Sequence, residues 1–348
     1  MSKNSRARYQ AKLQLRGNTV PSLLAAMIDG KEYASIVDKV PSSGYDVLND
    51  VSQALGDIEA IRGRPCVAYL GNVVRADTGG SSIDASDDLP FQEMIRQVPA
   101  DHRKIDVLLA TNGGSGQQVV RFVECLRNRF DEVDFLIPSF CMSAGTLWAL
   151  SGDHIWMTPG AALGPIDPQI PSASGRYVPA QALLLLVEKL RQEGEAGLRN
   201  GTGVPWTSVR IIDTIDKKEL GDAITATKYS STMAAQFLER YKLRHWTVRE
   251  SSQQAVTPEW RSQRARDVGD ALASHDRWNN HGHSITRDVL WREIRLKIDH
   301  PDDQLLRAMS RVWALYNWIF DKTPVVKLMV SSDYRHVRTE LKQGTPNA

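Results

Sequence analysis

Four short apolar runs, separated by helical stretches, constrain the fold of this chain more than any other feature. They are Cys66 to Leu70, Val107 to Ala110, Phe135 to Pro138 and Ile155 to Met157. Each run is uncharged and only a few residues long, which is typical of a strand buried on both faces. Strands that alternate with helices form βαβ units and a mostly parallel sheet. We therefore expect an α/β core.

The stretches between the runs support this arrangement. Apolar residues at Val119, Val120, Val123 and Leu126 place a stripe on one face of a helix, which we expect from about residue 117 to residue 130. Residues 71–90 are rich in Asp, Ser and Gly, with little periodicity, so they are expected to form a surface loop, with a mobile lid as the alternative.

At 348 residues, the chain exceeds the size at which one hydrophobic core usually stops growing. We expect a helical N-terminal arm over residues 1–61 that serves as an appendage or in oligomerisation. The α/β core should span 62–245, and a helical, Trp-rich extension should span 246–348. The tryptophans of this extension are more typical of packing than of binding.

Composition and charge narrow the class of protein. Apolar residues make up 42% and charged residues 24%, as in ordinary globular enzymes. The formal net charge is only +2, so we expect no nucleic-acid partner. The first 16 residues hold five basic and no acidic residues (Lys3, Arg6, Arg8, Lys12, Arg16), which we interpret as a solvated face.

The sequence also indicates where the protein resides. The basic N-terminus is not followed by an apolar leader, and no run approaches the ~18 apolar residues that cross a bilayer, so we expect a cytoplasmic protein. Its three cysteines, Cys66, Cys125 and Cys141, lack the spacing of a disulfide framework or a zinc site. Free thiols and no metal are expected.

Three motifs follow predicted strands: TNGG at 111–114, MSAGT at 142–146 and LGPIDPQ at 163–169. Loops at the carboxyl ends of parallel strands are where α/β proteins assemble their sites. In the first motif, paired glycines let the backbone turn sharply and present amide N–H groups to a substrate. A simple turn would have the same residues.

Ser143 lies in the second motif, between the FLIP strand and a helix expected from about residue 144 to residue 150. A helix N-terminus offers unpaired N–H donors that favour a developing oxyanion. The serine is therefore a candidate nucleophile. Its alternative role is to cap the helix, which serine does well.

Together the motifs resemble the serine dehydrogenase proteinase family, which is related to signal peptide peptidase A and more distantly to the Clp protease, within the crotonase superfamily. The resemblance covers roughly residues 62–245 and includes VLLATNGGSGQQVVRFVECLR, IPSFCMSAGTLWALSGDHIWMTPGAALGPIDPQI and a later HGHSI at 281–285. It implies a Clp protease/crotonase-like spiral of ββα units, with helical extensions at both ends of this chain. It also implies Ser143 as nucleophile, an oxyanion hole at Gly113, Gly114 and Ala144, and a homo-oligomer.

Serine needs a general base, because its hydroxyl is a weak nucleophile. Clp proteases carry a histidine about two dozen residues after the serine, where this chain has IDPQ; His154 lies too early, and we interpret it as structural. Relatives of signal peptide peptidase A use a lysine, so a Ser–Lys dyad is expected. Lys189 follows the apolar run ALLLLV, which could bury its amine and keep it neutral. The rival lysines are Lys217, Lys218 and Lys228.

Three further residues are accessory candidates. His281 and His283 belong to HGHSI, where they could lie near the site, cap a loop or contact another subunit. Asp167 could orient a base or position substrate, although prolines at 165 and 168 favour a rigid turn.

We therefore expect a serine endopeptidase that acts on peptide or protein substrates. It should need no metal, nucleotide or other cofactor. The chain has no GxxxxGK[ST] phosphate loop, so any ATP-dependent unfolding of substrates would come from a separate partner. One alternative is a crotonase-type acyl-CoA enzyme, which would not need a serine at position 143. The other is a catalytically silent scaffold that binds peptides or a membrane-associated partner. Serine deamination is not expected, since the chain lacks a pyridoxal lysine context and an iron–sulfur cysteine set.

Overall fold

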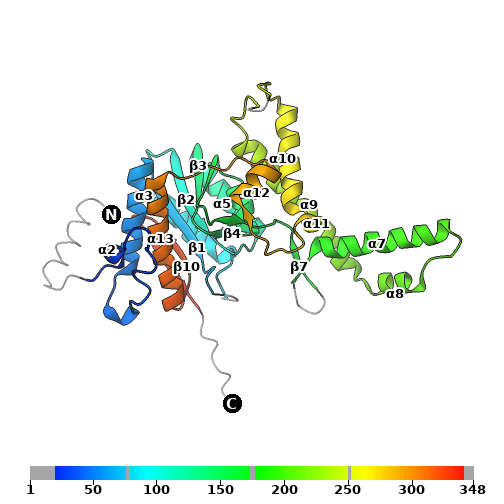
Figure 1. Cartoon of the computed structure of the whole chain (residues 1–348), viewed down its shortest axis with the longest axis horizontal. Coiled ribbons are helices and arrows are strands. Elements are labelled where there is room, and N and C mark those ends of the chain that lie inside the picture. The colour runs from blue at the N-terminus through cyan, green and yellow to red at the C-terminus, as the bar shows by residue number, and fades with distance from the viewer. Residues whose placement is uncertain (1–19, 76–78, 173–176, 250–251, 341–348) are drawn as a thin grey trace, which may run out of the picture. The chain divides into compact units, whose positions relative to one another are not determined.

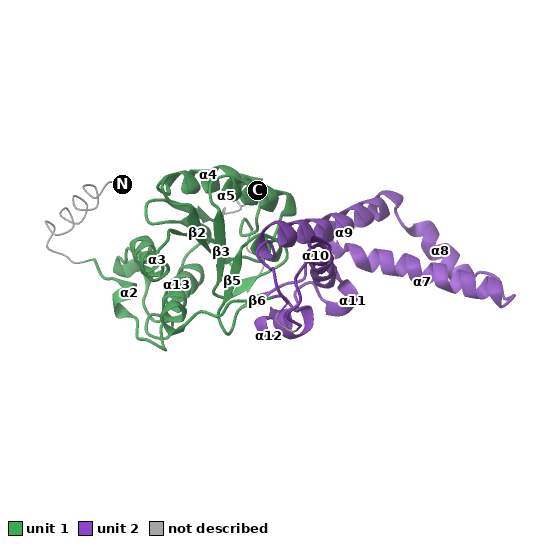
Figure 2. Ribbon diagram, turned by 90° about the horizontal axis from the view of Figure 1, so that it is seen from above, with its two compact units in different colours: residues 1–162, 297–348 green, residues 163–296 purple. Residues whose placement is uncertain are grey.

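The computed structural model describes residues 20–75, 79–172, 177–249 and 252–340; the five basic N-terminal residues lie outside this part. The chain divides into two compact units, residues 1–162 with 297–348 (unit 1) and residues 163–296 (unit 2), coloured separately in Figure 2. These units group the residues differently from the three segments expected from the sequence. The reason is that the end of the chain returns to unit 1 and adds strands to its sheet.

Unit 1 is built on a six-stranded sheet with the order β11-β10-β1-β2-β3-β5 (Figure 1). The four apolar runs form its parallel part, as expected: β1 (Cys66–Gly71), β2 (Lys104–Ala110), β3 (Glu132–Ile137) and β5 (His154–Met157). Every residue of β1 is buried, and all of β2 except Lys104. The mixed α/β fold with a parallel-rich sheet is therefore confirmed.

Helices cover both faces of this sheet (Figure 2). One face packs against the buried sides of α2 (Leu23–Ala26), α3 (Val47–Arg62) and α13 (Asp303–Lys322). The other face carries α4 (Asp88–Gln97), α5 (Gly116–Arg127) and α6 (Ala144–Ala149), with Phe122 and Trp148 at the centre of an aromatic cluster. The predicted crossover helix is α5. Its amphipathic stripe matches its position, because one helical face lies on the sheet and the other in solvent.

The C-terminal part departs from the helical extension expected after residue 245. Residues beyond α13 form β10 (Val325–Val330) and β11 (Arg335–Thr339), and β10 pairs antiparallel with β1. The apolar run that forms β10 is interrupted by Lys327, which obscures the strand pattern. This lysine is fully buried.

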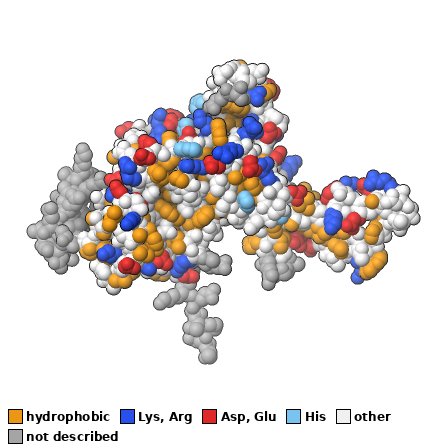
Figure 3. Space-filling view, viewed as in Figure 1, with side chains coloured by type: hydrophobic (Ala, Val, Ile, Leu, Met, Phe, Trp, Pro, Cys, Tyr) orange, Lys and Arg blue, Asp and Glu red, His pale blue; other side chains and the backbone are white. Residues whose placement is uncertain are grey.

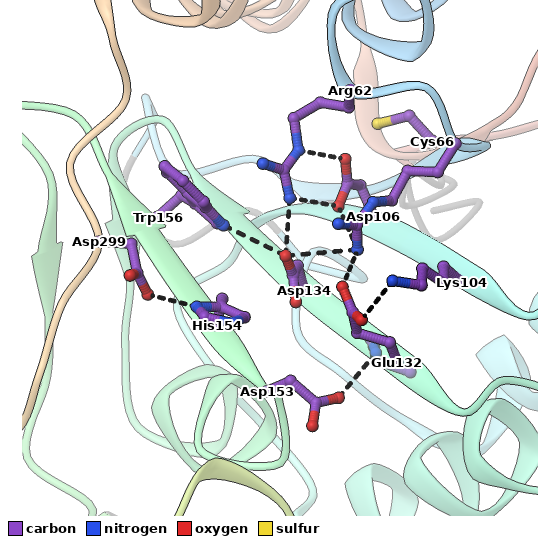
Figure 4. A network of polar contacts seen from close by, with 12 residues as sticks. Arg62, Cys66, Lys104, Asp106, Glu132, Asp134, Asp153, His154, Trp156 and Asp299 are labelled. Atoms are coloured by element: carbon purple, nitrogen blue, oxygen red, sulfur yellow. Dashed lines mark hydrogen bonds and ion pairs between the residues drawn. The ribbon is translucent and has the colours of Figure 1, made fainter. Parts of the chain in front are cut away.

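A network of ion pairs is buried where the parallel strands begin (Figure 4). Arg62 contacts Asp106 at 2.9 Å and Asp134 at 2.7 Å, and Arg64 lies 3.7 Å from Asp106. Trp156 donates to Asp134 at 3.3 Å and stacks under the Arg62 guanidinium. Burial raises the pKa of Asp106 to about 6, although Arg62 opposes that shift. This network lies at the opposite end of the strands from the candidate active site.

Unit 2 is mostly helical. Its longest helices are α7 (Ala180–Arg199), α8 (Trp206–Thr214), α9 (Lys217–Phe237) and α10 (Pro258–Ala273). Its shorter elements are the hairpin strands β7 (Gln169–Pro171) and β8 (Tyr177–Pro179), the π-helices Leu238–Lys242 and Leu290–Ile294, α11 (His275–Trp278), β9 (Ile285–Thr286) and α12 (Arg287–Val289). The remaining described elements are β4 (Phe140–Cys141), β6 (Ala162–Leu163) and two 3₁₀ turns, Pro41–Ser43 and Ala85–Asp87.

Helices α7 to α9 leave many apolar side chains in solvent, and Figure 3 shows such side chains on the surface over α7 and α8. We call this set the apolar arm: Leu185, Leu186, Leu198, Val204, Trp206, Val209, Ile211, Ile212, Ile224 and Tyr229. Across the described residues, no helix is both long enough and apolar enough to cross a membrane.

Candidate active site

Ser143 occupies the turn between β4 and α6 in a strained backbone conformation. Its φ is 50° and its ψ is −118°, which a residue with a Cβ rarely adopts. Its side chain does not cap α6, so the alternative role expected for it is not observed. In the described part of the chain the hydroxyl makes no hydrogen bond, and the residue is only partly buried. A strained turn that leaves a hydroxyl available is typical of a nucleophile.

The TNGG loop follows β2 and packs against this turn. Both of its glycines have positive φ, 103° at Gly113 and 138° at Gly114. A Cβ added at Gly113 would lie 2.7 Å from the Ser143 Cβ and 3.2 Å from the Ala144 nitrogen. Only glycine permits this approach, so Gly113 lies directly against Ser143 and Ala144.

The backbone amides of this loop are not equivalent. Gly113 donates its N–H to the Thr111 hydroxyl at 3.1 Å, so that amide is engaged within the loop. In the residues that the structure describes, the Gly114 and Ala144 amides donate to no protein acceptor. Of the three amides expected in the oxyanion hole, these two therefore have no acceptor within the described residues.

Thr111 holds the loop and the serine turn together. Its N–H donates to the Phe140 carbonyl at 3.0 Å, and its carbonyl accepts from the Met142 amide at 2.8 Å. Its methyl group would lie 2.4 Å from a Cβ added at Gly145, so α6 begins directly against it. Cys141, beside this contact, is buried, which raises the pKa of its thiol and makes it unreactive.

The lysine candidates lie in unit 2 and are exposed. Lys189 is on α7, but the apolar run does not bury it, because Leu183 and Leu184 turn toward a cluster with Ala223 while Lys189 falls on the open face. Lys217 and Lys228 are also exposed. The desolvation expected for Lys189 is thus not found in the single chain.

Lys218 is ion-paired with Asp222 at 2.7 Å. The hydrogen bond to this carboxylate raises the pKa of the Lys218 ammonium, which keeps it protonated. A lysine in this state is a poor proton acceptor.

The accessory residues Asp167 and His281 meet in unit 2. The Asp167 carboxylate is 1% exposed and lies 2.7 Å from Nδ1 of His281, which is partly exposed. It also lies 3.3 Å from Nδ1 of His275, a residue that the sequence did not single out. His275 has no motif around it, and only the fold brings it to Asp167. His283 instead stacks on Trp278, with ring centroids 5.2 Å apart.

A carboxylate that holds an imidazole at Nδ1 is the arrangement that orients a general base. Besides lying between two prolines, Asp167 therefore contacts two histidine rings. His154, interpreted above as structural, is held by Asp299 at 3.1 Å in unit 1.

The sheet, the glycine loop and the strained serine belong to an α/β protein with a parallel-rich sheet. Residues 81–196 match the family described as ClpP-like SDH-type serine proteinases, which confirms for this segment the family expected from the motifs.

Two uncharacterized proteins of Methanocaldococcus jannaschii are similar to parts of this chain. MJ0137 is 37% identical over 95 residues, which cover 27% of this chain and 31% of that protein. MJ1495 is 29% identical over 158 residues, which cover 44% of this chain and 49% of that protein. The chain thus spans about a third to a half of the length of these curated relatives.

Among solved structures, the chain is similar to a mutant of the 1510-N membrane-bound stomatin-specific protease in complex with a substrate peptide. The match is 22% identical, covers 33% of this chain and 57% of that chain, and has a TM-score of 0.25.

Proposed function

We propose that this protein is a serine endopeptidase in which Ser143 is acylated by the substrate. The observation that carries the proposal is the strained Ser143 turn, whose hydroxyl makes no capping bond and which packs against the TNGG loop. The Ser143 oxygen attacks the peptide carbonyl carbon, and the resulting oxyanion accepts hydrogen bonds from the Gly114 and Ala144 amides. A base removes the hydroxyl proton and delivers it to the leaving amine. Water then hydrolyses the acyl-enzyme.

Lys189 is the leading candidate for that base, in a Ser–Lys dyad. Its exposure in the single chain means that a neutral amine requires cover from another subunit or from substrate. The alternative is His281, which a specific observation supports: the buried Asp167 carboxylate holds its ring at 2.7 Å. Each residue is proposed as the group that accepts the serine proton. Comparing the labelling rates of Lys189 and His281 variants therefore shows which of them is the base.

A cytoplasmic homo-oligomer acting on peptide or protein segments is the form of the enzyme that we propose. The apolar arm supports the oligomer, because large apolar side chains exposed together on one set of helices are typical of an interaction surface. A membrane-associated partner is the alternative cover for this surface.

A fluorophosphonate probe tests the proposal directly, since it reacts only with an activated serine. We expect one labelled site, mapped by peptide mass spectrometry to Ser143, and no labelling of the Ser143→Ala variant. Labelling at another serine, or none in the assembled protein, would contradict the peptidase. Absence of labelling together with acyl-CoA binding would favour the crotonase-type enzyme, and peptide binding without labelling would favour the silent scaffold.

A further inference from the structure

A short segment preceding α4 forms one side of the glycine loop. Residues 81–84, which we call the strap, contain Ile83, whose N–H donates to the Gly113 carbonyl at 2.8 Å and whose carbonyl accepts from the Ser115 amide at 2.8 Å. Ile83 and Gly114 form a parallel bridge, and Ile83 is 1% exposed. The strap therefore pairs with the loop that supplies the candidate oxyanion hole.

The backbone of the strap packs so closely on the glycine loop that a shift of the strap would also move the loop. A Cβ at Gly114 would lie 2.3 Å from the Ile83 carbonyl oxygen and 2.6 Å from the Ile83 nitrogen. The carbonyl of Ser81 likewise lies 2.5 Å from where a Cβ of Gly71, at the end of β1, would be. Since backbone packs on backbone at both points, the position of the strap determines the position of Gly114.

Lys327, on strand β10 of the sheet, holds the strap through hydrogen bonds. Its side chain is fully buried, and its Nζ donates to the Ser82 carbonyl at 2.6 Å and to both carboxylate oxygens of Asp87 at 2.7 Å. Asp87, also fully buried, accepts a hydrogen bond from the Asp84 amide at 3.0 Å. The ion pair thus joins the sheet to both ends of the segment that contains Ile83.

The surroundings of this pair account for its burial. The Tyr69 hydroxyl donates to Asp87 at 2.7 Å, and Arg338 reaches Asp87 at 3.2 Å and Asp84 at 3.4 Å. Burial lowers the pKa of Lys327, while the Asp87 carboxylate opposes the shift. A buried ion pair is retained only where such hydrogen bonds offset desolvation, and replacing it with apolar residues is often neutral for stability. Its presence here therefore suggests a role other than stability.

We propose that Lys327 and Asp87 are positioning residues for the oxyanion hole, which hold the strap on the TNGG loop and so keep the Gly114 amide in place beside the Ser143 turn. This role rests on the proposed function. Neither residue contacts the reacting groups. Both act through Ile83, by fixing a backbone donor whose displacement by about 1 Å would cost on the order of a hundredfold in rate.

The test is the second-order rate of fluorophosphonate labelling at Ser143 in folded, full-length protein. The variants are Lys327→Met and Asp87→Asn, and the matched control is Asp106→Asn, which neutralises a buried, ion-paired carboxylate at the other end of the same sheet. Each variant is labelled well below its own unfolding midpoint. We expect labelling by Lys327→Met and Asp87→Asn to fall about 10- to 100-fold, and labelling by Asp106→Asn to match wild type.

The pH dependence separates positioning from a change in the base. Loss of an oxyanion donor lowers the labelling rate by the same factor at every pH and leaves the midpoint of the profile unchanged. Wild-type labelling rates in folded Lys327→Met or Asp87→Asn, or a shifted midpoint, would overturn the positioning role. If neither variant folds, Arg338→Gln provides the test, because its side chain is 21% exposed and contacts the same carboxylates. It should label about two- to threefold more slowly, because the strap is only partly released, and an unchanged rate would overturn the role.

If wild-type protein itself does not label at Ser143, the proposed function fails instead. The two failures are therefore distinguishable.

Discussion

Gly113 lies so close to Ser143 that the two residues exclude any side chain between them. A Cβ at Gly113 would lie 2.7 Å from the Ser143 Cβ, and the residue has a φ of 103°. A side chain at Gly113 is therefore excluded twice, by the steric contact with Ser143 and by the positive φ of the backbone. The loop and the serine turn are therefore fitted to each other without any intervening side chain.

Gly113→Ala is expected to lower Ser143 labelling by at least about a hundredfold and to destabilise the protein by about 1–3 kcal/mol, because the loop must move and its φ becomes strained. Labelling kinetics and denaturant unfolding measure the two effects. Gly160→Ala is the control, since no atom lies within 4 Å of its added Cβ. Equal labelling in both variants would show that the contact is irrelevant to the serine.

Ser143→Gly separates stability from activity. Glycine adopts a positive φ without strain, so this variant is expected to gain about 1 kcal/mol in the free energy of unfolding while losing all labelling. Ser143→Ala retains the Cβ, should lose labelling equally, and should not gain that stability. Equal stability of the Gly and Ala variants would argue against strain at this turn.

The general base can be identified by matched substitutions. If Lys189 accepts the proton, Lys189→Met lowers labelling by about 10²- to 10⁴-fold, the usual contribution of a general base. Lys218→Met should have no effect, because its ammonium is already paired with Asp222. Loss of labelling in His281→Gln, with Lys189→Met unaffected, would instead assign the base to the Asp167–His281 pair.

Stability should depend on Asp106 in a defined pH window. Its folded pKa of about 6 lies above the ordinary value of 3.8, so its contribution is complete below about pH 4 and is lost as the pH rises through about 6. The loss is about 3 kcal/mol for this buried group. Unfolding of wild type and Asp106→Asn between about pH 4 and pH 7 measures it. As the pH rises, the free energy of unfolding of wild type should fall relative to that of Asp106→Asn by this amount. Parallel plots of unfolding free energy against pH for the two proteins would refute the assignment.

The apolar arm should control association. Replacing Trp206, which is 75% exposed, together with Ile212 by serine is expected to lower the solution mass measured by light scattering toward that of a monomer. The unfolding midpoint of the monomer should change little, because both side chains are exposed in the single chain. Trp291→Ser, exposed but outside the arm, serves as the control. An unchanged mass would show that the arm does not mediate self-association and would favour a different partner for it.

The amino-acid sequence alone determined the parallel strands, the crossover helix α5 and the three motifs, because local hydrophobic period and glycine placement encode them. It also predicted that the Ser143 turn and the glycine loop lie together, since both follow strands and parallel strands end at one edge of a sheet.

Only the tertiary structure decided which of these groups are available for chemistry. It showed that the Gly113 amide donates to the Thr111 hydroxyl and that the Lys189 side chain is exposed on α7. It also showed that the His275 ring contacts the Asp167 carboxylate. It also brought Lys327 to Asp87, 240 residues earlier in the chain. These contacts join residues far apart in sequence, so no local pattern records them; they arise where the chain packs on itself and buried polar groups must find partners.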